Sequence, residues 1–582
     1  MLRCFFLISG LQINIHKSSV LGVGVHEAEV THMANIIGCG AAKFPLKYLG
    51  VPVGCNMARC LNWNAVLLKF SSKLSSWKAR LLSVGGRLSL IRSVLGNLPI
   101  YYMSLYPMPV AIRKKLESMR NKFFIGGDPV EKKLTWIKWD KCLASKREGG
   151  LGIGSIFGLN IGLLFKWFWR FFCDQSDLWI RVIKSIHGPG GGINSDTNTS
   201  LKRSTWGSIL SSINSLKSKG IDLFSYCTRK IGNGLDSSFW SDLWCGNQPL
   251  KVMFPRIFLL ETDKQCSIAS RVGLIDWSSV LRRVPRGGEE SSQFNALLSV
   301  IGSTSLSDQC DVWQWSLNGL SGFSVASVRH LVDSWLLDTC NDATRWNRLL
   351  PIKVNVFLWR LKLNKLPSRV NLDRRGIDVI SINCPSCQGD LETVNHTFFN
   401  CGLAKELWSL LAKWWDLDIP MCGNIAEWHA WLGDLHVSSK VRLAIEGVGG
   451  TLLWSIWNFR NNLIFSSTPP KKSMIWDSVV SQSFLWISSR NPKCKISWIA
   501  SGAQDTSTSP EPKQGRRVTE DQDDSIVQVR KGKAGDGNRG RESGKKKTHR
   551  QTGGGHGRRP SGETILERGD EAIIRKAARQ KR

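Results

Sequence analysis

Residues 384–401 hold the most informative stretch of the chain: Cys384-Pro-Ser-Cys387, then eight residues, His396, four more residues and Cys401. Two cysteines separated by two residues form a knuckle, a tight turn that presents both sulfur atoms to one side. A histidine and a cysteine shortly afterwards complete three thiolates and one imidazole, a tetrahedral ligand set that Zn²⁺ prefers. The spacing therefore predicts a structural zinc site. This spacing indicates a metal but does not indicate an activity. The alternative interpretation is four buried residues that fall close together by chance.

The length and composition indicate a multidomain protein with a sizeable core. The chain has 582 residues, of which 42% are apolar, enough for two to four domains. We find no uncharged apolar run of about 18 residues that would indicate a membrane span. The apolar residues 1–10 lack a small-residue cleavage site, so they are interpreted as core and not as a signal peptide. Sixteen cysteines without a framework spacing indicate a reducing compartment, the nucleus or the cytoplasm.

The net charge points to a polyanionic partner. The formal charge is +33, and residues 501–582 contribute only +8 of it, which leaves +25 on residues 1–500. Nucleic acid is the commonest partner of so basic a protein. The alternative is a solvated basic surface.

Tryptophans are frequent and many stand beside basic residues. The chain has 26 of them, as in Trp77-Lys78 and Lys166-Trp167. Such neighbours can stack on bases and hold phosphates. At helical spacing, however, the ring more often fills a core while the basic side chain extends to solvent. The core interpretation is favoured for most of them.

Apolar periodicity and turn residues predict the elements of the first half. A helix end and a turn at Ser9-Gly10 precede a strand at 11–15, and residues 44–53 form a hairpin or a strand followed by a turn. Three helices follow, at about 63–82, 87–95 and 110–124, with Gly85-Gly86 breaking the first from the second. The third helix carries a polar side with Arg113, Lys114, Lys115, Arg120 and Lys122.

The second half mixes short strands with helices. Residues 186–200 have linker composition, and strands are expected at 313–315 and 323–325. A helix rich in Trp, Phe and Leu covers 346–366, as a scaffold for the zinc site or a phosphate-facing surface. An amphipathic helix at 403–415 closes the apolar side of the site. Residues 501–582 lack the apolar content for a core and are expected to be disordered.

Many short motifs in the same order resemble the reverse transcriptases of plant LINE-type (non-LTR) retrotransposons. They span residues 1–500 and are, in chain order, Ser9–Asn14 with Lys17-Ser18, Phe44–Gly50, Leu74–Arg80, Gly85–Leu88, Leu98–Tyr102, Gly149–Gly152 with Asn160 and Lys166-Trp167, Gly232–Gly234, Phe239-Trp240, Asp242–Trp244, the cysteine cluster with Glu392-Thr393, and Trp454–Trp457 with Arg460-Asn461.

The resemblance implies an α+β, mostly helical fold and a division of the chain. Its parts are a palm-edge and primer-grip remnant at 1–60, a helical thumb at 61–185, a linker and mixed connecting region at 186–340, a small Cys3His zinc-binding domain at 341–420, a helical extension at 421–500 and a disordered basic tail at 501–582.

The resemblance also implies roles for individual residues. Lys17 would lie near the incoming nucleotide and assist proton transfer, and Tyr48, Leu49 and Gly50 would position the primer end. The thumb motifs add Lys78, Arg80 and Arg87 as nucleic-acid contacts. Cys384, Cys387, His396 and Cys401 would hold Zn²⁺. From the residues alone, Lys17 is an ordinary surface lysine after a strand.

The carboxylates that polymerisation needs are not found in this sequence. Two metal ions must be held by paired carboxylates, which the family carries upstream of the segment resembled here. The adjacent pair Asp523-Asp524 lies in the polar tail without a preceding strand and is attributed to chance. The chain is therefore expected to be inactive alone, with Mg²⁺ required only in an intact parent polymerase. No phosphate-binding glycine loop and no carboxylate cluster suited to ribonuclease H stands out.

Three hypotheses for function follow. In the first, the chain is the C-terminal part of a retrotransposon RNA-directed DNA polymerase that binds template RNA or an RNA–DNA hybrid, with no membrane involved. In the second, it is a zinc-stabilised module whose Trp-rich faces bind protein. In the third, it is a pseudogene product, because the missing palm would leave the apolar face of residues 1–15 uncovered.

Overall fold

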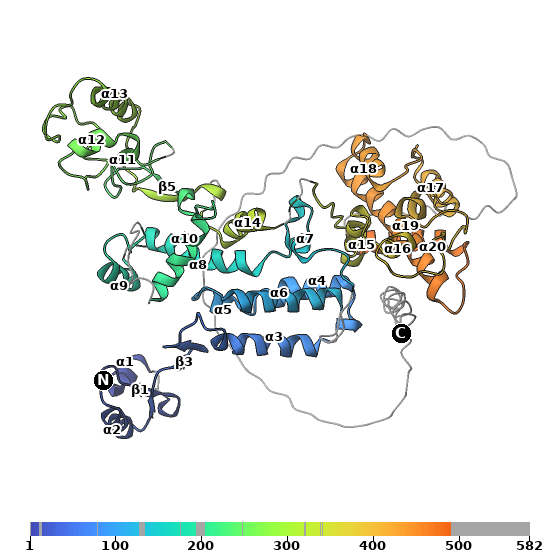
Figure 1. The fold of residues 1–582 in the computed structure, drawn as a ribbon, viewed down its shortest axis with the longest axis horizontal. Coiled ribbons are helices and arrows are strands. Elements are labelled where there is room, and N and C mark those ends of the chain that lie inside the picture. The colour runs from blue at the N-terminus through green and yellow to red at the C-terminus, as the bar shows by residue number, and fades with distance from the viewer. Residues whose placement is uncertain are drawn as a thin grey trace, which may run out of the picture.

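The computed structural model describes residues 2–490, apart from 11–13, 78, 127–133, 175, 194–203, 247, 319–321, 338 and 340–341. Across these residues the fold is α+β and mostly helical, as predicted, with short strands that pair in two-stranded sheets. Lys78, Asp523-Asp524 and the expected disordered tail at 501–582 lie outside the described residues. Figure 1 shows helical groups strung along the chain, with the zinc-ligand segment in the group that contains α15 to α20.

A small α/β unit begins the chain. Its elements are α1 (Leu2–Ser9), a 3₁₀ turn η1 (Ile15–Lys17), β1 (Ser19–Leu21), α2 (Glu27–Ile37) and β2 (Gly40–Ala42). β1 pairs with β2 in parallel, Ser19 opposite Gly40. The strand expected at 11–15 is therefore wrong where it can be checked, because Ile15 begins a 3₁₀ turn that the Asn14 side chain caps. The interpretation of residues 1–10 as core is wrong for Phe6, Leu7 and Ile8 on α1, whose side chains are exposed.

The predicted hairpin at 44–53 is confirmed. β3 (Leu46–Tyr48) pairs antiparallel with β4 (Val51–Val53). The two residues between them, Leu49 and Gly50, have φ of 49° and 82°, the left-handed values of a tight two-residue hairpin turn. Glycine adopts such a conformation without strain, whereas Leu49 does so at some cost in free energy.

The second group is a helical bundle. Its elements are η2 (Cys60–Trp63), α3 (Asn64–Ser76), η3 (Ala79–Leu81), α4 (Val84–Leu90), η4 (Ile91–Leu95, a π-helical turn), α5 (Ile100–Met103), α6 (Val110–Ile125), α7 (Trp139–Leu143) and η5 (Lys146–Glu148). Its core includes Trp63, Phe70, Leu88 and Leu116. In Figure 1, α3, α6 and α4 lie alongside one another.

Two expectations for this bundle are wrong. Gly85 and Gly86 do not break the helices but lie inside α4, which the Ser83 hydroxyl caps by accepting from the Gly86 N–H at 3.1 Å. The break is at 77–83, after α3. Arg120 is not on the polar side of α6: its side chain is buried and pairs with Glu117 at 2.9 Å.

Gly85 has a packing reason for being glycine. A Cβ at this position would lie 2.9 Å from the backbone nitrogen of Lys353, closer than real Cβ contacts allow. The absence of a side chain lets α4 approach the start of α15 (Ile352–Lys362), which is 267 residues further on. A local helix-breaking interpretation of the glycine pair misses this because the partner is distant in sequence.

The long helix α8 (Ile156–Cys173) forms the centre of a second core. Leu164, Phe165 and Phe168 are fully buried and pack with α10 (Thr205–Lys217) and α14 (Val325–Leu336). By length and composition alone, α8 could cross a membrane, and half of it is buried inside the structure. Its apolar composition is explained by this core position.

The middle of the chain continues this core and adds a third one. Its elements are α9 (Leu178–His187), η7 (Phe224–Tyr226), β5 (Cys227–Lys230), α11 (Leu250–Met253), α12 (Pro255–Leu260), α13 (Glu289–Gly302), β6 (Val312–Trp315) and η8 (Ser316–Asn318). β5 pairs antiparallel with β6, which confirms the strand at 313–315. The strand expected at 323–325 is wrong, because Ser324 caps α14 by accepting from the Ser327 N–H at 3.1 Å. Phe239 and Trp240 lie buried at the centre of the third core.

The last group surrounds the zinc-ligand segment. It contains α15, α16 (Arg369–Asp373), the π-helical turn η9 (His396–Asn400), α17 (Gly402–Trp415), α18 (Ile425–Asp434), α19 (Ser439–Phe465) and α20 (Met474–Arg490). The predicted helix at 403–415 is confirmed as α17, and the one at 346–366 is shorter because Pro351 precedes it as N-cap. Val356 and Trp359 of α15 pack in the bundle core and Phe357 and Leu361 in this one. α15 is thus a scaffold.

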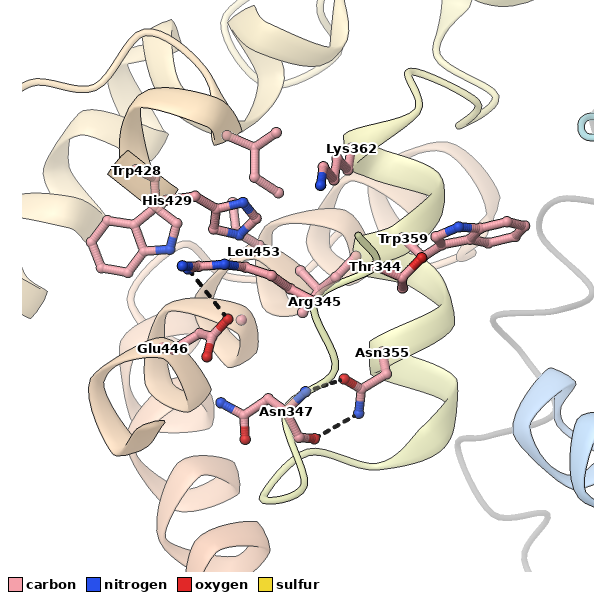
Figure 2. Close-up of a pocket in the computed structure, with 13 residues that line it drawn as sticks. Thr344, Arg345, Asn347, Asn355, Trp359, Lys362, Trp428, His429, Glu446 and Leu453 are labelled. Carbon is pink, nitrogen blue, oxygen red and sulfur yellow. Dashed lines mark hydrogen bonds and ion pairs between the residues drawn. The ribbon is translucent and has the colours of Figure 1, made fainter. Parts of the chain in front are cut away.

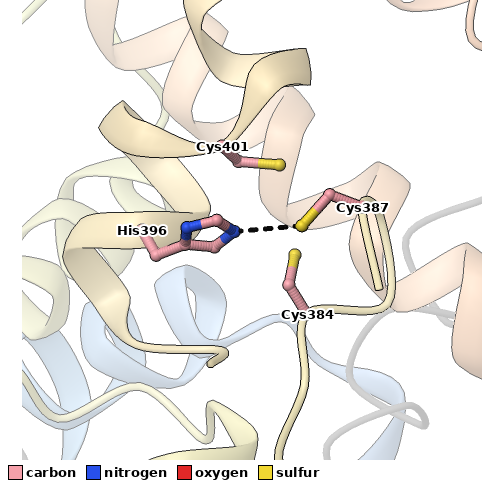
Figure 3. Close-up of side chains that lie close together, drawn as sticks. All are labelled: Cys384, Cys387, His396 and Cys401. Carbon is pink, nitrogen blue, oxygen red and sulfur yellow. Dashed lines mark hydrogen bonds between the residues drawn. The ribbon is translucent and has the colours of Figure 1, made fainter. Parts of the chain in front are cut away.

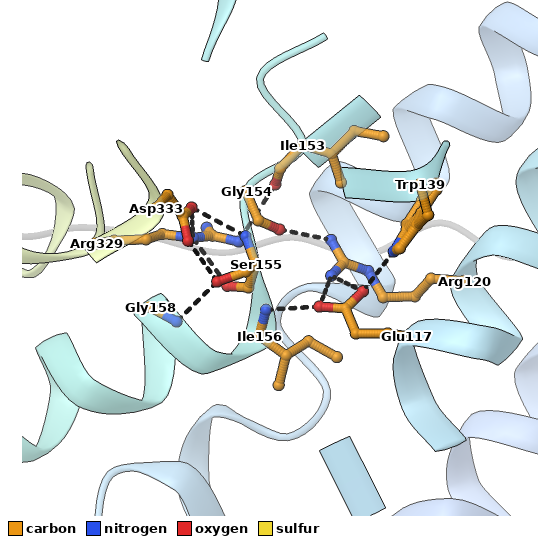
Figure 4. Close-up of polar contacts among 10 residues, drawn as sticks. All are labelled: Glu117, Arg120, Trp139, Ile153, Gly154, Ser155, Ile156, Gly158, Arg329 and Asp333. Carbon is orange, nitrogen blue, oxygen red and sulfur yellow. Dashed lines mark hydrogen bonds and ion pairs between the residues drawn. The ribbon is translucent and has the colours of Figure 1, made fainter. Parts of the chain in front are cut away.

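A polar network fixes the loop between the bundle and α8 from two sides (Figure 4). On one side Glu117 of α6 accepts from the Ile156 N–H at 2.8 Å and from the Trp139 ring N–H at 2.8 Å. On the other, Asp333 of α14 accepts from the backbone N–H and the hydroxyl of Ser155. Burial raises the pKa of Asp333 although these hydrogen bonds oppose the shift. The network holds α14 against α8 and restrains the loop that leads into α8.

Candidate metal centre

The four residues singled out by their spacing converge in the structure. The sulfur atoms of Cys384, Cys387 and Cys401 and a ring nitrogen of His396 all lie within 4.8 Å of one another. Figure 3 shows the side chains pointing to a common centre. In a tetrahedral zinc site with Zn–S bonds of about 2.3 Å, neighbouring sulfur atoms are roughly 3.8 Å apart. The donor set and its spacing therefore fit a four-coordinate Zn²⁺.

The first two ligands come from a tight turn. The Gln388 N–H donates to the Cys384 carbonyl at 2.8 Å, and Gln388 has a left-handed φ of 59° that reverses the chain. The Cys384 N–H donates to the Asp390 carbonyl at 2.7 Å, and Asn383 bridges Leu391 in antiparallel fashion. The turn brings both sulfur atoms to one side, as the knuckle spacing predicted.

The other two ligands come from the start of the next helices. His396 is the first residue of η9, and its carbonyl accepts from the Cys401 N–H at 2.7 Å. Cys401 is the N-cap of α17, where the positive end of the helix dipole favours a thiolate. The π-helical turn lengthens the path from His396 to Cys401 so that both side chains face the knuckle.

Two of the thiols share a hydrogen bond. This bond lowers the pKa of Cys384 and raises the pKa of Cys401, while the backbone N–H groups of Cys387 and Ser386 add to the lowering at Cys384. Cys384 and Cys401 are buried, whereas Cys387 is exposed. The site therefore favours a thiolate at the buried Cys384 and stays reachable for a cation through Cys387.

A buried ion pair anchors the segment between Cys387 and His396. Glu392, five residues after Cys387, accepts from Arg460 of α19 at 2.5 and 2.7 Å, and both side chains are almost fully buried. The Arg369 N–H also donates to Glu392, at 2.6 Å, and its guanidinium donates to the Asn383 carbonyl at 2.7 Å. The knuckle is thereby anchored to α16 and α19. Spacing around the cysteines gave no sign of this pair.

The predicted primer-positioning residues stand on the β3–β4 turn. Tyr48 and Leu49 are exposed. The turn is held to the bundle by tyrosines of the α5 region, since the Tyr102 hydroxyl donates to the Gly50 carbonyl at 3.0 Å and the Tyr106 hydroxyl to the Pro52 carbonyl at 3.4 Å. The turn is thus a fixed, exposed feature beside the N-terminal end of α3.

The predicted basic contacts are not gathered with this turn. Lys17 is exposed on η1, and Arg80 is exposed on η3, beyond the other end of α3, a helix roughly 20 Å long. Arg87 is buried and donates to the carbonyls of Phe124, Ala79 and Leu82 at 2.7 to 3.1 Å. Its position gives Arg87 a structural role in joining α4 to α6.

A pocket between α15, α18 and α19 also collects charged side chains (Figure 2). Arg345 lies 3.6 Å from Glu446, and Lys362 donates to Asp342 at 2.6 Å. Burial lowers the pKa of His429 to about 4, and the two cations add to the lowering. Since each cation already faces a carboxylate, the charges of this pocket are balanced.

Residues 323–408, from just before α14 into α17, match the family described as zinc-binding in reverse transcriptase. All four converging residues lie inside that match. The segment is therefore similar to the zinc-binding domain of reverse transcriptases.

Two relatives extend the likeness beyond the zinc-binding segment. A putative ribonuclease H protein of Arabidopsis thaliana is 24% identical over 409 residues, 69% of this chain and 64% of the relative. An uncharacterized mitochondrial protein of the same plant is 28% identical over 148 residues, 25% of this chain and 92% of the relative. The chain thus spans 64% of the length of the first relative. Together these matches support a reverse-transcriptase-related retroelement protein.

Proposed function

We propose that this chain is the C-terminal part of a LINE-type reverse transcriptase that binds template RNA or an RNA–DNA hybrid through its thumb and zinc-binding domain. On this proposal it does not polymerise nucleotides by itself. The zinc-binding match, the two plant relatives and the order of the thumb motifs support it. Its free thiols fit the nucleus or the cytoplasm, where such sites stay reduced.

The observation that carries the proposal is a long stretch without acidic residues. Residues 30–116 contain twelve Lys and Arg and no Asp or Glu. This stretch includes the β3–β4 turn, α3, α4 and the first half of α6. A surface whose charges are all positive, and which reaches the proposed primer-positioning turn, suits a phosphate backbone.

The structure shows which of these charges reach solvent. α3 buries Phe70 and exposes Lys69 and Lys73, and α6 buries Leu116 and exposes Lys114 and Lys115. The single acid of the two helices, Glu117, is turned inward to Arg120 and Trp139. Within the described parts of α3 and α6, the exposed charges are therefore all positive.

Binding of a fluorescent RNA–DNA hybrid to the full chain, measured by anisotropy at several salt concentrations, tests the proposal. Lys114→Gln combined with Lys115→Gln should weaken binding about tenfold at low salt and reduce the slope of log K against log salt by about 2. The matched control removes the same charge from the exposed α19–α20 connection, Lys471→Gln with Lys472→Gln, and should change little. An equal loss of affinity in both variants, or a wild-type affinity that does not depend on salt concentration, would contradict a thumb interface.

The competing protein-interaction hypothesis needs exposed tryptophan faces. Among the tryptophans that the structure describes, Trp335 and Trp414 are the exposed ones, whereas others such as Trp63, Trp240 and Trp428 are buried in cores. This burial favours the core interpretation of the tryptophans. Nucleic-acid binding is therefore the better supported function.

A further inference from the structure

Asp390 joins the two halves of the metal centre. Its backbone carbonyl accepts from the Cys384 N–H at 2.7 Å, which fixes the knuckle. Its carboxylate oxygen Oδ2 lies 3.5 Å from His396 Nδ1, on the other half of the site. The second ring nitrogen, His396 Nε2, faces the sulfur atoms and lies 3.3 Å from Cys387 Sγ (Figure 3). The imidazole is therefore placed between a carboxylate and the thiolates.

This placement decides which nitrogen can bind a metal. A neutral imidazole has one N–H and one lone pair, and only the nitrogen with the lone pair can be a ligand. An acceptor beside Nδ1 favours the proton there and leaves the lone pair on Nε2, the atom that faces the sulfurs. The nearby Thr393 hydroxyl accepts from the backbone N–H of His396 at 3.1 Å.

We propose that Asp390 is a positioning residue of the zinc site, whose carboxylate holds His396 in the tautomer and ring orientation that present Nε2 to the metal. With a metal bound at Nε2, the Nδ1–H would be a stronger donor toward the Asp390 carboxylate oxygen that lies 3.5 Å away. This inference rests on the zinc part of the proposed function and is independent of nucleic-acid binding.

Asp390 can be replaced without disturbing the core. Its side chain is 77% exposed, so truncation opens no cavity, and its backbone hydrogen bond to Cys384 remains in any variant. The matched control is Asp418, an exposed aspartate in the connection between α17 and α18. Asp390→Ala and Asp418→Ala remove the same charge from the same domain.

The test measures zinc affinity of the full chain by competition with a chromogenic chelator. Asp390→Ala should weaken zinc binding about 10- to 100-fold, a usual effect of losing the carboxylate behind a ligating histidine. Asp390→Asn, which keeps an acceptor oxygen, should recover part of this loss, and Asp418→Ala should stay within about twofold of the wild type.

A spectroscopic measurement separates positioning from a general electrostatic effect. In the zinc-loaded chain labelled with ¹⁵N-histidine, the Nδ1–H signal of His396 should be visible in the wild type and in Asp418→Ala. In Asp390→Ala it should broaden through exchange with solvent. Zinc affinity within twofold of the wild type and a sharp Nδ1–H in Asp390→Ala would overturn this inference alone. A wild-type chain that binds no zinc would overturn the zinc assignment as well.

Discussion

Glu392 and Arg460 are 68 residues apart in the sequence and form a bidentate ion pair, with N–O distances of 2.5 and 2.7 Å. Neither side chain is more than 1% exposed. Arg460 also donates to Asn461 and to the Pro367 carbonyl, and its guanidinium lies 4.7 Å from the Trp457 ring centre. The pair fixes residues 388–395, between the knuckle and His396, to the long helix α19. The metal-binding segment and the helical extension are therefore one folding unit at this point.

Removing one member of this pair should strongly destabilise the domain. Glu392→Gln leaves the buried guanidinium of Arg460 without a counter-charge, and breaking a buried pair in this way typically costs about 3 to 5 kcal/mol. Chemical denaturation followed by tryptophan fluorescence measures the free energy of unfolding. Asp174→Asn, which breaks the exposed pair with Arg170, is the control and should cost less than about 1 kcal/mol. Equal losses of unfolding free energy in the two variants would show that the Glu392–Arg460 pair stabilises the chain no more than a surface pair does.

Zinc should be needed for the local fold. Cys387→Ser and His396→Ala each remove one ligand and should reduce bound zinc from one per chain to none, with loss of protection from hydrogen exchange over about 380–415, because a structural metal supplies folding free energy. Metal analysis of the purified chain gives the stoichiometry. Cys422→Ser, which removes a half-buried thiol outside the ligand set, should leave zinc in place. One zinc per chain in both ligand variants would refute the assignment.

The two neighbouring glycines of α4 should respond in opposite ways to alanine. At Gly85 the added Cβ meets the Lys353 backbone at 2.9 Å, so α4 and α15 must separate, and Gly85→Ala should destabilise the chain by about 1 to 3 kcal/mol. At Gly86 the nearest atom is 3.7 Å away. Gly86→Ala should therefore be neutral or stabilise by up to about 1 kcal/mol through helix propensity. Thermal unfolding of both variants checks the contrast, and a similar shift in both would contradict the close approach of the two helices.

His429 should make the folded chain sensitive to mild acid. Burial, reinforced by Arg345 and Lys362, lowers its pKa from 6.5 to about 4. Between these values the unfolded chain binds a proton that the folded chain does not, so the free energy of unfolding falls as the pH decreases. At pH 5 the loss is at most about 2 kcal/mol.

The pH effect is measured as the difference in unfolding free energy between pH 7 and pH 5. That difference should shrink in His429→Gln and stay unchanged when the exposed His436 is replaced by glutamine. The same pH dependence of the unfolding free energy in the wild type and in His429→Gln would contradict this role of His429.

Local sequence patterns were sufficient for elements that depend on neighbours in the chain. The hairpin at 44–53, the strand at 313–315 and the helix at 403–415 were predicted because turn residues and apolar period lie within the element itself. The strands expected at 11–15 and 323–325 failed for a local reason, because Asn14 and Ser324 cap helical turns there. Two other failures occurred where a distant contact decided the outcome. Gly85-Gly86 was predicted to be a break, but its partner is α15. Arg120 was expected in solvent, but Glu117 and the Gly154 carbonyl hold it inside.

The sequence by itself determined the metal-ligand set, because three cysteines and one histidine at a fixed spacing need only a turn and the start of a helix to meet. It also determined the mostly helical character of the fold and its basic charge. The tertiary structure alone decided which side chains support the ligands and which charges reach solvent. Glu392 meets Arg460, and Arg87 turns inward while Lys114 and Lys115 stay outside. These outcomes depend on burial and on contacts between residues far apart in the chain, which no local pattern encodes.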